Sequence, residues 1–255
     1  MSPPKPFRRR YGLSPAWIAA LNGAAIAAVA ASLLLMSLPA TRSATYNVLT
    51  DETGPVELVT AGAFLLGAIL SFRLSREARD RGEGRAVVLA YAGFALLCFL
   101  GVLEETSWGQ TLFDYRAPEW IRDLNEQGEM NLHNLPGVME LNSAGVLVFG
   151  VLGLLGIRLE SSDRWRTFCV PRALAPLFAV IACMAALETF IDFHPIERRF
   201  DMTVGTVSET VEMIGAIGCL ACVWLNGRRL RRRWDAGLTA LPVADEAEPF
   251  PERAA

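Results

Sequence analysis

Eight carboxylates of this chain lie near the ends of apolar segments, and the order of those segments brings all eight to one end of a bundle. They are Glu57, Glu104, Glu105, Glu140, Glu188, Asp192, Glu209 and Glu212. Ionisable side chains close to a hydrocarbon layer are costly, so they tend to mark binding or catalytic sites. A carboxylate beside metal-bound water can act as a general base. The pattern therefore predicts a single polar site.

The densest polar stretch, from Glu104 to Asn134, contains one of only two histidines. Glu129 and His133 are four residues apart, so a helix would place them on one face. In an extended segment Glu129, Asn131 and His133 would share a face instead. Both geometries predict that two or three metal-ligand side chains converge. The alternative is a surface loop that carries one histidine.

The second histidine, His194, follows two acids at helical spacing. Glu188 and Asp192 are four residues apart, so they face the same way, and His194 leaves the apolar segment just beyond them. A lone carboxylate at the depth of Glu188 would cost a few kcal/mol without a partner. This group therefore favours a ligand set at the same end as His133.

Glu209 and Glu212 repeat the pattern, three residues apart, near the start of the last apolar segment. Arg198 and Arg199 offer a rival explanation, because they could pair with these acids and serve only the structure.

The enzyme hypothesis assigns a role to each residue of the predicted site. Glu104 or Glu105 would be the general base, with Gln110 beside them, and Trp108, Asn131 and Asn134 would complete the polar surroundings. The set suits a divalent metal, with zinc, iron and manganese favoured by histidine and calcium by oxygen ligands. The predicted metal ligands are Glu129, His133, Glu188, Asp192, His194 and Glu212.

The apolar segments are long enough to cross a membrane. Of 255 residues, 52% are hydrophobic, and each segment has roughly 17–25 residues, which as a helix spans a hydrocarbon core of ~30 Å. The expected fold is all-α, a polytopic membrane protein. Its predicted transmembrane helices cover Ala16–Leu38, Pro55–Phe72, Ala86–Leu103, Pro136–Ile157, Val170–Phe193 and Thr206–Leu225.

The basic residues predict the orientation. Apart from Arg253 near the end of the sequence, eighteen lysines and arginines fall in the two terminal segments and the second and fourth connections, against five in the other three connections. By the positive-inside rule both termini are cytoplasmic and the carboxylates face outward. Arginine-rich usage with a single lysine indicates a bacterium, so we expect the inner membrane. The net charge of −3 hides this separation of sign between the two sides.

Three domains are expected: a cytoplasmic lead (1–15), the six-helix transmembrane domain (16–233) and a disordered cytoplasmic tail (234–255). The long connection after the third span predicts a short amphipathic helix around Glu119–Glu126, entered through Pro118, that lies on the outer membrane surface.

The stretch EETSWGQ, followed by ExNLHN, resembles a family of bacterial multi-pass membrane proteins for which no activity can be transferred. The matching residues are Glu104, Glu105, Ser107, Trp108, Gly109, Gln110, Glu129, Asn131, Leu132, His133 and Asn134. A looser likeness joins the chain to membrane hydrolases of the ceramidase and adiponectin-receptor kind, which hold zinc with histidines among seven spans. This chain has six predicted spans, two histidines and no His-x-x-x-His pair.

We therefore expect an outward-facing metal site, with hydrolysis or group transfer on lipid-linked substrates as its use. A cation- or proton-coupled transporter and a non-catalytic subunit of envelope assembly are the alternatives. Membrane lipids are the expected partners. Nucleic acid is excluded as a partner because no aromatic interleaving accompanies the arginine clusters.

Overall fold

The computed structural model describes residues 11–12, 14–51, 53–113, 115–122, 125, 130, 138–161, 166–194 and 197–237. Within these ranges six helices are long and apolar enough to cross a membrane, which confirms the predicted all-α polytopic fold. They are α2 (Pro15–Ser37), α4 (Pro55–Asp80), α5 (Arg85–Glu105), α8 (Met139–Arg158), α9 (Ala175–Phe193) and α10 (Arg198–Asp235).

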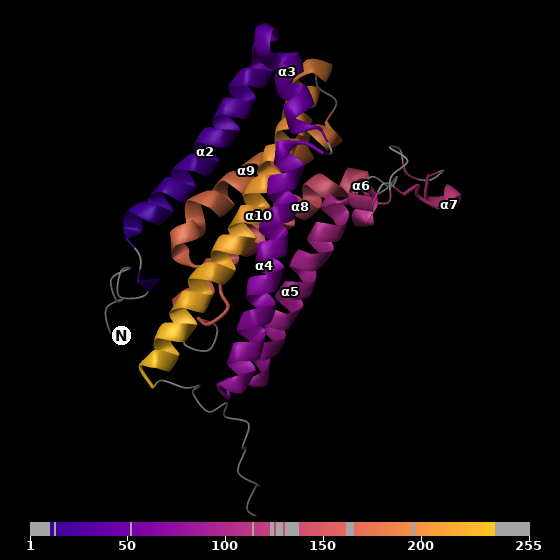
Figure 1. Cartoon of the computed structure of the whole chain (residues 1–255). Coiled ribbons are helices and arrows are strands. Elements are labelled where there is room, and N and C mark those ends of the chain that lie inside the picture. Colours follow the sequence, from indigo (N-terminus) through magenta and orange to yellow (C-terminus); the bar gives the residue numbers. More distant parts are fainter. Residues whose placement is uncertain are drawn as a thin grey trace, which may run out of the picture.

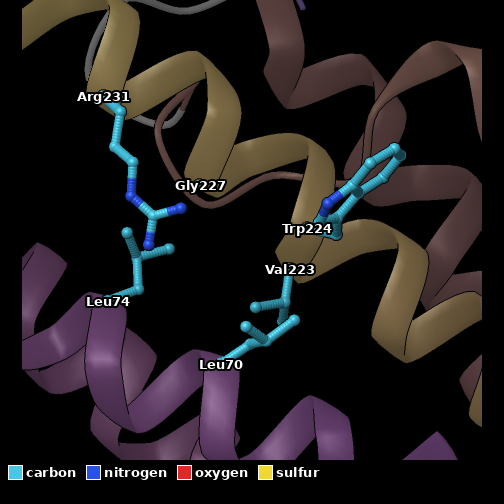
Figure 2. A pocket seen from close by; sticks show the side chains of 6 residues that line it. All are labelled: Leu70, Leu74, Val223, Trp224, Gly227 and Arg231. Carbon is cyan, nitrogen blue, oxygen red and sulfur yellow. The ribbon is translucent and has the colours of Figure 1, made fainter.

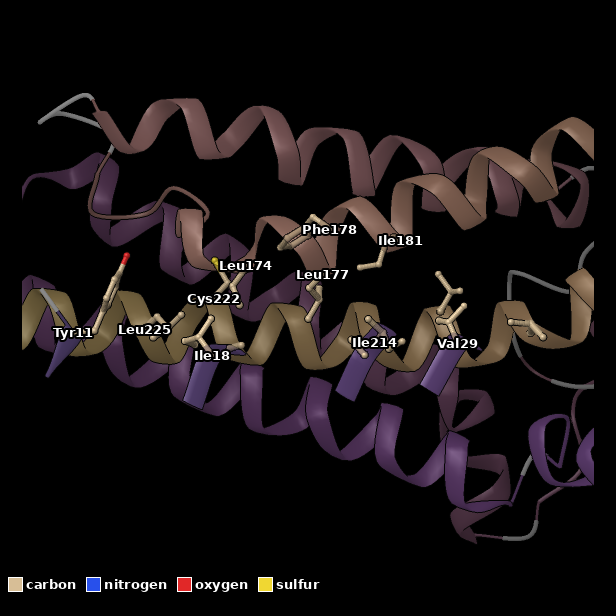
Figure 3. Close-up of a cluster of buried hydrophobic side chains, with 14 of the residues drawn as sticks. Tyr11, Ile18, Val29, Leu174, Leu177, Phe178, Ile181, Ile214, Cys222 and Leu225 are labelled. Carbon is tan, nitrogen blue, oxygen red and sulfur yellow. The ribbon is translucent and has the colours of Figure 1, made fainter. Parts of the chain in front are cut away.

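Helix α10 is the centre of the bundle. It packs against α2, α4 and α9, while α5 pairs with α4 and α8 pairs with α9 (Figure 1). The largest core lies where α2 and α9 meet α10, with Ile18, Leu177 and Ile214 among its buried side chains (Figure 3). Glycine brings α8 close to α9, because a Cβ on Gly150 would lie 2.8 Å from the backbone nitrogen of Ala182. Such close backbone contact at small residues is typical of membrane helices.

Proline marks where several of these helices begin. Pro15 and Pro55 occupy the first turns of α2 and α4, where the missing N–H has no intrahelical partner to lose. Ser14 caps α2 by accepting a hydrogen bond from the Ala16 amide at 3.3 Å.

Helices α3, α4 and α10 differ most from the sequence prediction. Helix α4 continues to Asp80, whereas its predicted end is Phe72. The first outer connection contains a helix, α3 (Pro39–Leu49), that has too little apolar character to be detected as a span. Helix α10 extends well past the predicted Thr206–Leu225 at both ends, because arginine-rich sequence has good helix propensity although it is not apolar. It includes Trp234, which is buried, so the helix continues two residues into the predicted tail.

The predicted amphipathic helix is shorter in the part that the structure describes. A 3₁₀ turn (Ser107–Gly109) leads into α6 (Gln110–Phe113), and α7 covers only Glu119–Arg122; residues 123, 124 and 126 lie outside the described ranges. In Figure 1, α7 projects to the side of the bundle, away from α2 and α3. Trp120 is 67% exposed, as expected of an interfacial aromatic residue.

The bundle has two chemically different ends. The acidic end is where α5 and α9 finish and α4, α8 and α10 begin. The basic end is where α4, α8 and α10 finish and where α2 and α5 begin, so Tyr11 and Asp235 are both there. Both ends carry buried or half-buried polar groups.

Candidate carboxylate site at the acidic end

Carboxylates from three helices converge at the acidic end. Glu57 on α4 and Glu105 on α5 lie within hydrogen-bonding reach of each other, and Glu209 and Glu212 on α10 are close enough to interact electrostatically with Glu105. All four side chains are partly buried. These four residues form the carboxylate cluster.

Local helix geometry aims the two adjacent acids of α5 in different directions. They are about 100° apart on the helix. Glu105 points to the carboxylate cluster, whereas Glu104 accepts a hydrogen bond from the indole Nε1 of Trp108 at 2.8 Å. The turn that brings Trp108 back has left-handed backbone at three successive residues, with φ of 45° at Ser107, 56° at Trp108 and 90° at Gly109.

Gln110 lies just after this turn and is engaged with the long connection. Its side-chain oxygen accepts a hydrogen bond from the amide of Met130 at 3.0 Å. Tyr115 donates to the carbonyl of Trp108 at 3.0 Å, also within the connection. Gln110, which the sequence placed beside the general base, thus contacts Met130 of the connection.

The acids of α9 and α10 that lie nearer to α8 accept hydrogen bonds from neutral partners. Ser208 donates to Glu188 at 2.6 Å and Ser143 donates to Asp192 at 2.5 Å. Asn142 donates to Glu212 at 3.1 Å. Glu188 also lies near enough to Glu212 and Asp192 for electrostatic interaction, so these acids continue the cluster across the bundle.

The rival explanation by arginine pairing does not hold for Glu209. No ion pair joins Glu209 to Arg198 or Arg199, and Arg199 donates instead to the carbonyl of Ser37 at 3.1 Å. All ion pairs within the described ranges lie at the basic end. The cluster therefore brings like charges together. The neighbouring acids accept hydrogen bonds from serine hydroxyls and from an asparagine amide.

The predicted metal ligands have different positions in the structure. His194 is exposed, stacks on Phe190 with ring centroids 4.2 Å apart, and its Nδ1 is 2.9 Å from the Phe190 carbonyl. Among the residues that the structure describes, no three metal-ligand side chains have the geometry to hold an ion. The remaining predicted site residues, Glu129, Asn131, His133 and Asn134, lie outside the described ranges.

Glu57 and Glu209 belong to the cluster although the sequence did not single them out as ligands. Both lie near the start of an apolar segment at the same end as Glu105. Glu57 is a lone carboxylate there and gives no spacing pattern, whereas Glu209 has the three-residue spacing to Glu212. Only the helix packing shows which acids meet.

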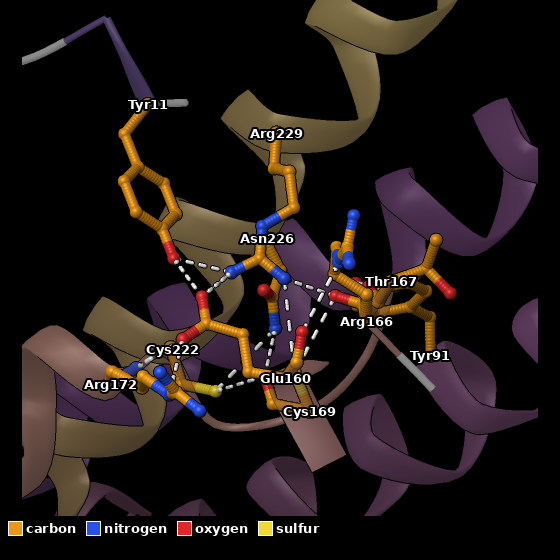
Figure 4. Close-up of polar contacts among 10 residues, drawn as sticks. All are labelled: Tyr11, Tyr91, Glu160, Arg166, Thr167, Cys169, Arg172, Cys222, Asn226 and Arg229. Atoms are coloured by element: carbon orange, nitrogen blue, oxygen red, sulfur yellow. Dashed lines mark hydrogen bonds and ion pairs between the residues drawn. The ribbon is translucent and has the colours of Figure 1, made fainter. Parts of the chain in front are cut away.

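A second polar network, at the basic end, was missed by sequence reasoning (Figure 4). Its centre is an ion pair between Arg229 on α10 and Glu160, which follows α8, with Nη2 and Oε1 2.7 Å apart. The hydroxyl of Tyr11 accepts from Arg229 and donates to Glu160 at 2.8 Å. Arg229 also donates to the carbonyl of Arg166, and the Arg172 amide donates to Glu160 at 3.1 Å.

The central residues of this network are buried, and burial shifts the pKa of its ionisable groups. The residues Arg229, Glu160 and Tyr11 are 4%, 3% and 2% exposed. Burial raises the pKa of Tyr11 to about 12, with the Arg229 charge acting in the opposite direction. Burial also raises the pKa of Cys169, whose carbonyl accepts a hydrogen bond from Asn226 at 2.8 Å. The network fixes the connection between α8 and α9 to α10 and to the start of the chain.

An apolar layer separates the two polar regions. It contains Ala68, Cys98 and Cys219, with Phe94 and Phe149 packed around them.

No protein-family model, curated protein or solved structure matches this chain.

Proposed function

We propose that this chain is an inner-membrane protein of a bacterium, with its basic end in the cytoplasm, that binds a cation from the outer side at the carboxylate cluster. The observation that supports the proposal is the meeting of Glu57, Glu105 and Glu209, from three helices, without an ion pair to any arginine among the residues that the structure describes. Repulsion between such groups is relieved when a proton or a metal cation lies among them.

The ligand chemistry favours a divalent cation that accepts oxygen donors. Carboxylate and amide oxygens suit calcium, magnesium or manganese, whereas zinc or iron would need His133 as well. Asn142, which already donates to Glu212 through its nitrogen, presents its amide oxygen nearby. Since no three described acids or histidines form a ligand set by themselves, the cation would also need Glu129 or His133, which the sequence places in the connection between α5 and α8.

The position of the cluster favours a surface-accessible site over a conduction path. The layer of Ala68, Cys98 and Cys219 below it is apolar, whereas a transporter needs polar groups across the midplane. We therefore propose hydrolysis or group transfer on a lipid-linked substrate as the use of the cation. A carboxylate of the cluster would act as base toward cation-bound water, and substrate would reach it along the membrane surface.

The proposal is tested on the full chain purified in detergent. Elemental analysis followed by calorimetric titration with calcium, manganese and zinc should find one bound cation. We expect Glu105→Gln and Glu209→Gln each to weaken it at least about tenfold, because a ligand oxygen loses its charge. Glu197→Gln is the matched control, since Glu197 is an exposed acid at the same end. A wild type that binds none of these cations would contradict the proposal.

Sidedness has its own experiment. Thr53 and Asp80 are exposed at the acidic and basic ends, respectively. Thr53→Cys should react with a membrane-impermeant thiol reagent from outside the cell, and Asp80→Cys only after permeabilisation. Both variants are made with Cys183 replaced by alanine, because it is the exposed natural cysteine among those the structure describes. The reverse labelling pattern would invert the orientation.

A further inference from the structure

An apolar groove with an arginine rim opens between α4 and α10 at the basic end. Leu70 and Leu74 of α4 face Val223 and Gly227 of α10 across a small depression (Figure 2). The side chain of Arg231 reaches from α10 toward Leu74 and forms the edge of this depression nearest the end of the bundle. We call it the lateral groove.

The partly exposed face of α10 continues the groove toward α2. Leu220, Trp224 and Arg228 follow one another at four-residue spacing, so they lie on one face of the helix, and each is half-buried. Trp17 of α2, which is 66% exposed, lies 6.5 Å from Trp224 between ring centroids. In Figure 1, α2 and α4 diverge toward the basic end with α10 between them.

Arg231 at the rim and the half-buried Arg228 on the adjoining face of α10 differ from the buried Arg229 because both are partly accessible. Arg228 lies over the Trp224 ring at 5.4 Å and uses its Nε to donate to the Tyr11 carbonyl at 3.0 Å. Its two terminal nitrogens donate to no acceptor in the described residues. Arg231 is 47% exposed and is paired with Glu77 through two hydrogen bonds of 2.8 and 2.9 Å, which hold the guanidinium over the depression.

We propose that the lateral groove binds an anionic phospholipid, with the phosphate at Arg228 and Arg231 and an acyl chain along Leu70 and Val223. Guanidinium groups bind phosphate oxygens through paired hydrogen bonds. Basic pockets between membrane helices select anionic head groups, and tryptophans such as Trp17 and Trp224 favour the head-group level. Charge complementarity thus identifies the occupant as a lipid of the leaflet at the basic end.

The proposal is tested by native mass spectrometry of the full chain titrated with phosphatidylglycerol and with phosphatidylcholine. We expect the wild type to retain phosphatidylglycerol selectively. Arg228→Gln and Arg231→Gln should each reduce its affinity roughly fivefold, and the double variant more strongly. The control Arg79→Gln, which removes an exposed arginine of α4 outside the groove, should bind as the wild type does.

A further variant separates lipid binding from a structural role of the ion pair. Glu77→Gln breaks the pair but leaves Arg231 its charge, so phosphatidylglycerol should bind at least as tightly as in the wild type. Equal losses in Glu77→Gln and Arg231→Gln would overturn the proposal, as would equal retention of both lipids. So would a loss in Arg79→Gln as large as in the rim variants, or a second copy of this chain bound in place of lipid.

Discussion

The acidic and basic ends of the bundle use glutamate in opposite ways. At the basic end Glu160 is surrounded by donors, namely Arg229, Tyr11 and the Arg172 amide, and its charge is matched. At the acidic end Glu105 meets Glu57, and the other described charges that act on it, those of Glu212 and Glu209, are also negative. The charge of Glu160 is matched within the protein, whereas we propose that a cation or proton matches the charges of the cluster. A buried carboxylate with basic partners therefore indicates a structural role, whereas one with acidic partners indicates a binding role.

The largest expected effect is at the basic end. Arg229→Met removes the buried counter-ion of Glu160 and leaves only the more exposed Arg172, whose Nε lies 3.8 Å from Glu160 Oε2. The free energy of unfolding should fall by about 3 kcal/mol. Denaturant unfolding in mixed micelles measures the loss. Arg231→Met, which breaks an exposed pair, should cost at most about 1 kcal/mol. Adding Glu160→Gln to Arg229→Met should recover part of the loss. Equal stabilities of Arg229→Met and wild type would contradict the structural role of the Glu160–Arg229 pair.

Alkaline pH provides a second way to break the buried network. The folded-state pKa of Tyr11 is about 12, and that of an unfolded tyrosine is about 10. The folded chain therefore keeps the proton longer, so the stabilisation is complete below pH ~10 and is lost as the pH rises toward ~12. The loss should be about 2–3 kcal/mol. Unfolding measured across this window should show a slope that Tyr11→Phe reduces and the exposed control Tyr46→Phe retains.

The smallest effect has the opposite sign and concerns the acidic end. In metal-free protein Glu105→Gln removes one of several like charges, so it should raise the free energy of unfolding by about 1 kcal/mol. Glu197→Gln should leave it unchanged. If Glu105→Gln instead destabilised the metal-free protein, the cluster would be a helix-packing element, as in the envelope-subunit alternative. The comparison between the two ends therefore depends on the sign of the change in unfolding free energy: a gain for Glu105→Gln, and a loss when the Glu160 ion pair is broken.

The sequence predicted the spans well because hydrocarbon burial requires long apolar helices, whatever their neighbours. The divergence of Glu104 and Glu105 follows from helix geometry alone. Sequence reasoning missed α3, whose polar composition resembles that of a loop. It could not show that Glu57 meets Glu105, because that contact depends on how α4 packs against α5.

The buried Glu160–Arg229 pair was hidden for a different reason. Arg229 is one of the eighteen basic residues that the sequence predicts on the cytoplasmic side, and most of them are explained by topology. A signal did exist, because Cys222, Asn226 and Arg229 lie on one face of α10 at spacings of four and three residues. That face continues the buried side of the helix, so an arginine there required a partner.

The continuity of α10 has a consequence for how the protein fits its bilayer. Glu209 and Arg229 are twenty residues apart on one unbroken helix, which is about 30 Å along its axis. A typical hydrocarbon core has this thickness, so the acidic and basic regions are spaced to reach the two membrane boundaries together. A thicker membrane would draw one of them into lipid, and a thinner one would be met by tilting of the helix. The spacing thus matches this protein to membranes of ordinary thickness.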